Sequence, residues 1–121
     1  MDDIIDLPSL AAELLDRARE SSSGRAAKQV YAVGPLRAVV IGLTEGGQLA
    51  EHNAPPAATL QCVTGNARLV AGDRSWVLTP GQLVAIPPER HSVDALSDCA
   101  LLLSVAADTP PTPVEEAIAA G

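Results

Sequence analysis

Two histidines, His52 and His91, are the side chains in this sequence that are best suited to chemistry. An imidazole titrates near neutral pH, so each histidine can act as a base, a hydrogen-bonding group or a metal ligand. Cys62 is a third candidate, because a cysteine sulfur binds soft transition metals. No obvious Ser/His/Asp or Cys/His/Asn set accompanies the histidines, and without carboxylate partners they provide a general base at best. Residue type alone therefore leaves binding and catalysis both open.

Both histidines lie in the segment 46–93, which holds nearly all of the strand-like sequence. His52 follows the pair Gly46-Gly47, a strand-like run ends at Gly65, and a strand led by Gly81 ends in the run Pro87-Pro88-Glu89-Arg90-His91. This order of glycines, prolines and histidines resembles the cupin family, and the resemblance covers roughly residues 36–105. It implies that the two histidines point into one small barrel.

Metal-binding members of that family hold the metal with a His-x-His pair, a following Glu, Gln or His, and one later histidine. Carried onto this chain, the resemblance places the first ligand on His52 and the last on His91. The second histidine falls on Ala54 and the third ligand on Ala57 or Ala58, and alanine has no donor atom. Iron, manganese and zinc sites need three or four side-chain donors. We therefore expect no native metal and no other cofactor; if a divalent transition metal is bound, its ligands are His52, His91 and, as a third donor, Cys62.

The strand that follows the two alanines predicts what lines the barrel. Alternation from position 58 places Leu60 and Cys62 on the inward face. With nearby valine and isoleucine side chains they would form an apolar pocket in which the imidazoles of His52 and His91 are the polar groups. Such a pocket favours a small, largely apolar ligand. We thus predict a small-molecule-binding cupin, and keep two alternatives: a metal-dependent dioxygenase or isomerase that uses His52 and His91, and a barrel that serves only as a dimeric scaffold.

The composition and the charge distribution narrow the classes of partner. Of the 121 residues 47% are apolar, there is no phenylalanine, and the aromatic residues are Tyr31 and Trp76. A core of Leu, Val, Ile and Ala suits a small barrel. The net charge of −7 comes from the ends, because residues 1–20 carry six acids and two bases (−4) and residues 108–121 carry three acids and no base (−3). The body is neutral and has no basic face, so we expect no nucleic-acid partner.

The cysteines and the N-terminal residues bear on the compartment. Cys62 and Cys99 lie in strand-like segments and form no CxxC pair, which favours buried free thiols in a reducing environment. The chain begins Met1-Asp2-Asp3, which is the wrong charge for a secretory leader, and no apolar run approaches the length of a membrane span. We expect a cytoplasmic protein with no membrane partner.

One amphipathic helix and about eight short strands are predicted along the chain. Apolar residues at helical spacing predict a helix over residues 7–20, with Asp6 as its N-cap and Glu13 paired with Arg17. Strands are expected at 29–33, 36–43, 60–64, 67–71, 75–78, 83–86, 92–95 and 100–105, with a type II turn at Thr79-Pro80-Gly81. That number and spacing predict an all-β, antiparallel jelly-roll barrel.

The chain divides into an N-terminal helix and linker (1–24), a cupin barrel (25–107) and a proline-rich tail (108–121). Within the tail, Thr112-Pro113-Val114-Glu115 matches a capping box and predicts a short helix at Pro113–Ala120. The apolar face of the first helix, with Leu10, Leu14 and Leu15, must be covered either by the barrel or by a second subunit. Together with an unpaired edge at the strand 29–33, this face predicts a homodimer.

Overall fold

The computed structural model describes residues 4–52 and 57–106, and these residues form one helix and nine strands. In chain order the elements are α1 (Leu7–Glu20), β1 (Arg25–Val33), β2 (Leu36–Leu43), β3 (Gln48–His52), β4 (Ala57–Thr64), β5 (Ala67–Ala71), β6 (Arg74–Leu78), β7 (Leu83–Ala85), β8 (His91–Ala95) and β9 (Cys99–Ala106). The positions of Ala54 and of the helix predicted in the tail lie outside the described residues.

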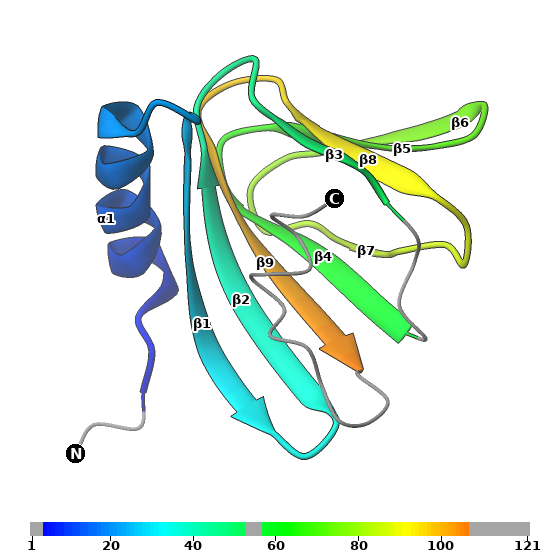
Figure 1. Ribbon diagram of the computed structural model, residues 1–121, viewed down its shortest axis with the longest axis horizontal. Helices are drawn as coiled ribbons and strands as arrows, with labels where there is room; N and C mark the ends of the chain where they lie inside the picture. Colours follow the sequence, from blue (N-terminus) through cyan, green and yellow to red (C-terminus); the bar gives the residue numbers. More distant parts are fainter. Residues whose placement is uncertain (1–3, 53–56, 107–121) are drawn as a thin grey trace.

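The strands form two antiparallel sheets that face each other. The five-stranded sheet has the order β1-β2-β9-β4-β7, and the four-stranded sheet has the order β3-β8-β5-β6. In Figure 1 the helix α1 lies on the outside of the five-stranded sheet, and the four-stranded sheet lies on its other side. The predicted all-β jelly-roll architecture is confirmed.

Strand boundaries differ from the predicted ones where a neighbouring strand extends the ladder. β1 begins four residues before the predicted 29, because Arg25 is paired with Leu43 at the far end of β2. β4 begins at Ala57 rather than at 60, because Ala57 is paired with Ala106, the last residue of β9. The pattern of side chains does not predict these hydrogen bonds, because their partners lie on strands that are distant in the sequence.

The inward faces of the two sheets form one core made almost wholly of aliphatic side chains. Its largest fully buried members come from both sheets and include Ile41, Leu43, Leu60, Leu69 and Leu101. Trp76 is partly buried and packs against this cluster. A core of this kind is what the absence of phenylalanine from the sequence requires.

The helix α1 has the predicted bounds and the predicted N-cap position, but Asp6 does not cap a backbone amide. Its carboxylate accepts a hydrogen bond from the Ser9 hydroxyl instead. Glu13 and Arg17 form the predicted pair one turn apart, with 3.9 Å between carboxylate oxygen and guanidinium nitrogen. Such exposed pairs contribute little stability, so the helix depends on what its apolar face covers.

The apolar face of α1 packs on the five-stranded sheet of its own chain. Ala11, Leu14, Leu15 and Ala18 are buried there. Contact is close because Gly42 of β2 has no side chain: a Cβ on it would lie 3.0 Å from the carbonyl carbon of Leu14. Of the two predicted covers, barrel or second subunit, the structure shows the barrel. Within the described residues no helix is long and apolar enough to cross a membrane.

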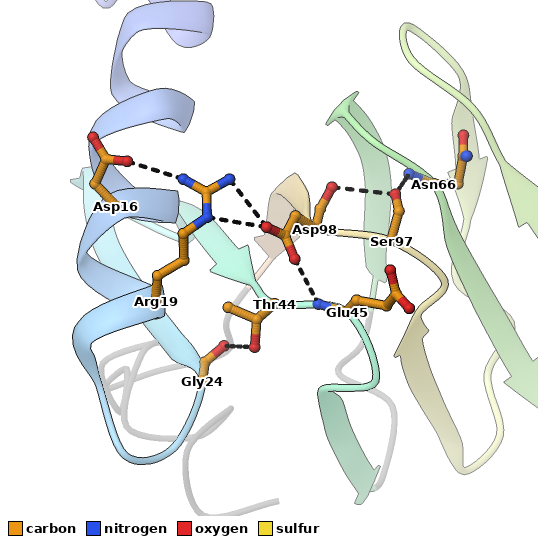
Figure 2. A network of polar contacts seen from close by, with 8 residues as sticks. All are labelled: Asp16, Arg19, Gly24, Thr44, Glu45, Asn66, Ser97 and Asp98. Carbon is orange, nitrogen blue, oxygen red and sulfur yellow. Dashed lines mark hydrogen bonds and ion pairs between the residues drawn. The ribbon is translucent and has the colours of Figure 1, made fainter.

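Asp98 ties the C-terminal end of α1 to the turns between strands (Figure 2). Its carboxylate accepts a hydrogen bond of 2.8 Å from the Glu45 backbone amide and contacts the Arg19 guanidinium through two nitrogens, each at 3.0 Å. The hydrogen bond from the Glu45 amide, followed by that from Arg19, holds the pKa of Asp98 below its ordinary value. Asp16 contacts the same guanidinium at 2.9 Å.

Replacing Asp98 by asparagine should lower the melting temperature at neutral pH and flatten the acid side of the stability curve. Because the folded-state pKa is depressed, the stabilisation is fully present above the unfolded pKa and is lost as pH falls through the folded pKa. Thermal melts between roughly pH 2 and pH 7 would measure this. Asp16→Asn is the control, since Asp16 bonds Arg19 at the helix surface. An equal effect of both substitutions would contradict the role assigned to the Glu45 amide.

Candidate ligand-binding site

His91 is the first residue of β8, and its side chain is 2% exposed. The strand β8 lies between β3 and β5 in the four-stranded sheet. His91 is therefore a buried strand residue. Burying an imidazole is costly unless its nitrogens are hydrogen-bonded. The hydrogen bonds of the His91 ring therefore determine which nitrogen carries the proton and which carries the lone pair.

The backbone of His52 lies directly opposite that of His91. The two residues are register partners across the antiparallel pair of β3 and β8, and the pairing shifts between Leu49 and His52. A shift of this kind re-aims a strand locally. The structure thus brings together the two positions that the sequence motif linked, whereas a shared cavity for both imidazoles stays a prediction.

The Nδ1 atom of His91 lies 3.1 Å from the Glu89 carbonyl oxygen. A carbonyl oxygen only accepts, so Nδ1 carries the proton in this bond. In the neutral ring Nε2 is then the nitrogen with the lone pair, which is the form that accepts a proton or binds a metal. The Glu89 amide in turn donates to the Pro87 carbonyl at 2.8 Å, which fixes the turn before β8.

The Glu89 side chain connects this turn to the β5–β6 hairpin. Its carboxylate pairs with the guanidinium of Arg74, which also lies over the ring of Trp76 at 5.2 Å from the centroid. Sequence reasoning missed this contact. The partner lies 15 positions away on a separate hairpin, and no local pattern in the sequence reports such a pairing.

Leu60 and Cys62 both face inward from β4, as alternation predicted. They are 1% and 0% exposed and belong to the core, and Ala58 packs against it. The Cys62 thiol donates to the Gly65 carbonyl at 3.1 Å. Burial raises the pKa of Cys62, and mainly burial raises that of Cys99 to about 12. Both cysteines are free, and a metal ion that bound Cys62 would have to displace its thiol proton.

Cys62 and His91 lie toward opposite ends of the barrel. Residues 65–67 lie beside the last residue of β8, because Ala67 is paired with Ala95 and Leu96 donates to the Asn66 carbonyl. His91 begins that strand four residues earlier, about 13 Å away at the usual rise. The sequence-based choice of Cys62 as a third donor is therefore not supported by its position or its chemistry.

The side chains of the described residues do not fit a metal site with three or more ligands. Among them no three histidine, cysteine, aspartate or glutamate residues gather closely enough to hold an ion. Ala58, one of the two positions at which metal-binding relatives would carry a donor, faces the core, while Ala57 is exposed. This part of the barrel wall is therefore apolar.

Comparison with solved structures shows that the chain shares its fold with cupin proteins. The sequence matches no protein-family model and no curated protein. A conserved protein of unknown function from Streptococcus pyogenes aligns with a TM-score of 0.68 and 18% identity over 88% of this chain and 89% of the other. A cupin superfamily protein from Desulfitobacterium hafniense aligns with a TM-score of 0.65 and 13% identity over 69% and 78% of the two chains. An RmlC-like cupin from Shewanella frigidimarina gives 0.65 and 19% identity over 73% and 80%. At these identities the likeness shows the fold alone: the two sheets of this chain have the fold of small cupin proteins.

Proposed function

We propose that this cupin domain binds a small, largely apolar molecule in its barrel without a complete metal site. The observation that carries the proposal is the buried imidazole of His91 at a strand end, beside the backbone position of His52. Because Nδ1 of the neutral ring donates to the Glu89 carbonyl, the imidazole would orient a ligand through a hydroxyl group that donates to Nε2. Pockets for small molecules commonly combine an apolar lining with a few such groups.

The surroundings of His91 support an apolar ligand. Inward residues of β8 and of the two strands beside it are aliphatic, among them Val93, Leu49 and Leu69. Of the described residues, Arg37 and His91 are the polar side chains that are buried. A ligand that displaced water from such a wall would gain mainly from apolar contact, at about 25 cal/mol per Å² buried.

Chelator dialysis followed by metal analysis separates this proposal from the metal-dependent enzyme. We expect protein purified without an affinity tag to retain far less than one equivalent of iron, manganese or zinc, because alanines occupy ligand positions. Retention of a full equivalent would replace the proposal with a dioxygenase or isomerase that uses His52 and His91.

Titration with cyclohexanol tests ligand binding directly. Cyclohexanol should shift the NMR signals of the His91 ring, and it should fail to bind the variant His91→Leu.

A homodimer remains our proposal, on the evidence of the edge strand alone. β1 is the end strand of its sheet, and its C-terminal half exposes Tyr31 and Val33 at 47% and 60%. Long apolar edges are usually covered by another chain. We expect light scattering at micromolar concentration to return twice 12.4 kDa. Tyr31→Lys with Val33→Lys should return 12.4 kDa, and Val77→Lys, on the exposed face of β6, should leave the dimer intact. A monomeric wild type would refute the dimer.

A further inference from the structure

Arg37 is a buried cation that has no counter-charge among the described residues. The residue is 6% exposed. It faces the barrel interior, because its register partner on β9 is the core residue Val105 and Val39 two positions along β2 is also in the core. Its Nη1 atom donates to the carbonyls of Gly34 and of Leu36, the latter at 3.0 Å. Among the described residues no carboxylate lies within ion-pair distance of it.

Gln29 supplies a second unmatched donor on the same wall. Its register partner on the neighbouring strand is Val39, so it also faces inward. Its Nε2 atom is buried and has no hydrogen-bond partner. Gln29 and Arg37 stand diagonally across the β1–β2 pair, a placement in which long side chains reach one another's surroundings. Among the described residues, Nε2 of Gln29 and the Nε and Nη2 atoms of Arg37 therefore lack acceptors on this wall.

These donors lie at the end of the barrel that carries the histidines. Leu36, beside Arg37, is paired with Ala106, and Ala106 is paired with Ala57 at the start of β4. Ala57 follows His52, the last residue of β3, by five positions. The β1–β2 turn and the start of β4 thus lie at the same end of the five-stranded sheet, and the start of β4 is five residues along the chain from the end of β3.

A buried guanidinium that lacks a carboxylate normally carries a large desolvation cost, and a buried amide nitrogen without an acceptor carries a smaller one. Both costs fall if a molecule brings acceptor oxygens to the wall. We propose that Arg37 and Gln29 form a subsite for the carboxylate of a bound organic acid. A guanidinium binds a carboxylate through two parallel hydrogen bonds, and Nε and Nη2 have no protein partner among the described residues.

This subsite narrows the proposed function, on which it rests, to small apolar molecules that carry one carboxylate. The aliphatic barrel would take the hydrocarbon part, and the β1–β2 wall would take the anionic end. A neutral amide of the same shape offers one acceptor oxygen instead of two and no negative charge for the guanidinium. The prediction therefore concerns the difference in binding affinity between an organic acid and its amide.

The test compares the affinities of hexanoate and hexanamide for the full chain at neutral pH. Binding is measured by NMR from the side-chain signals of Arg37 and Gln29. Hexanoate should shift both signals and bind at least about tenfold more tightly than hexanamide, since charge-assisted bonds are roughly twice as strong as neutral ones. Arg37→Gln should lose about tenfold or more in hexanoate affinity, Arg37→Lys should recover part of it, and Gln29→Leu should lose a few-fold. Arg68→Gln, which removes the same charge from the exposed face of β5, is the control and should change little.

Equal affinity for acid and amide, or hexanoate affinity unchanged in Arg37→Gln, would overturn the subsite. Those results would leave the broader proposal standing if both probes still shifted the ring signals of His91. Failure of both probes to bind at millimolar concentration would overturn the subsite as well. Binding of both probes without any effect on His91 would count against the broader proposal alone.

Discussion

Replacing Gly65 by alanine should destabilise the domain by about 3–5 kcal/mol, a large share of the total stability of a chain this size. Gly65 has φ +75°, a conformation that alanine adopts only at a cost. A Cβ on it would also collide with the Asp98 carbonyl and would lie 2.7 Å from the Cys99 Cα. Both obstacles are backbone atoms of the segment that starts β9, so side-chain rotation does not relieve the clash.

Gly46→Ala is the matched control for this prediction. Gly46 has φ +83°, close to that of Gly65, but a Cβ there meets nothing within 4 Å. The substitution Gly46→Ala should cost only the free energy of placing alanine in the left-handed backbone conformation, about 1–2 kcal/mol. Urea denaturation of the three proteins gives the comparison through the transition midpoint. If the two variants lost the same stability, the close approach of the two chain segments at Gly65 would not matter.

Local periodicity predicted those elements of the fold whose own residues decide them. The helix Leu7–Glu20 and the strand Leu36–Leu43 have the predicted bounds. The turn at Gly81 is as predicted too, with φ +90° and a hydrogen bond from the Gln82 amide to the Thr79 carbonyl at 3.0 Å. In each case the signal lies within a few residues of the structure it specifies.

Sequence pattern did not predict the inward placement of Arg37. Alternation separates two faces of a strand when one of them is polar. The strand β2 is buried on both faces, by the core and by α1, so valine and isoleucine run continuously from Val39 to Ile41 and leave the parity open. Arginine is also rarely buried. Its orientation follows from register with β9, which is contact information that the sequence of β2 does not contain.

The candidate site was predicted only in part, because its arrangement also depends on contacts between strands. The motif order linked His52 with His91, and their strands are paired at those residues. Alternation placed Leu60 and Cys62 on the inward face, and they are buried there. Alternation gives the face of a strand but not the position along the barrel axis. The sequence analysis therefore grouped Cys62 with the histidines, although the Cys62 thiol is bonded to the Gly65 carbonyl near the opposite end of the barrel.

Restoring donors at the alanine positions should create a metal site where the parent has none. We expect Ala54→His with Ala58→Glu to raise the affinity for Co²⁺ by about 100-fold or more over the parent. The reason is that two further ligands join the two histidines, and Ala58 faces the core from the start of β4. In the absence of metal the buried glutamate should lower the melting temperature, and Co²⁺ should restore it.

Ala54→His with Ala57→Glu is the control that decides whether direction matters. Ala57 adjoins Ala58 but is exposed on β4, so its carboxylate would point away from the barrel. The added histidine gives this variant three donors, so it should bind Co²⁺ better than the parent but at least about tenfold more weakly than Ala54→His with Ala58→Glu, and Co²⁺ should raise its melting temperature by less. Titration followed by the visible absorption of bound Co²⁺ measures all three proteins. An equal gain for both double variants would show that the added carboxylate acts from the surface. Failure of either variant to exceed the parent would instead mean that the two histidines do not converge on one point of the barrel, and the proposed ligand site would lose its basis.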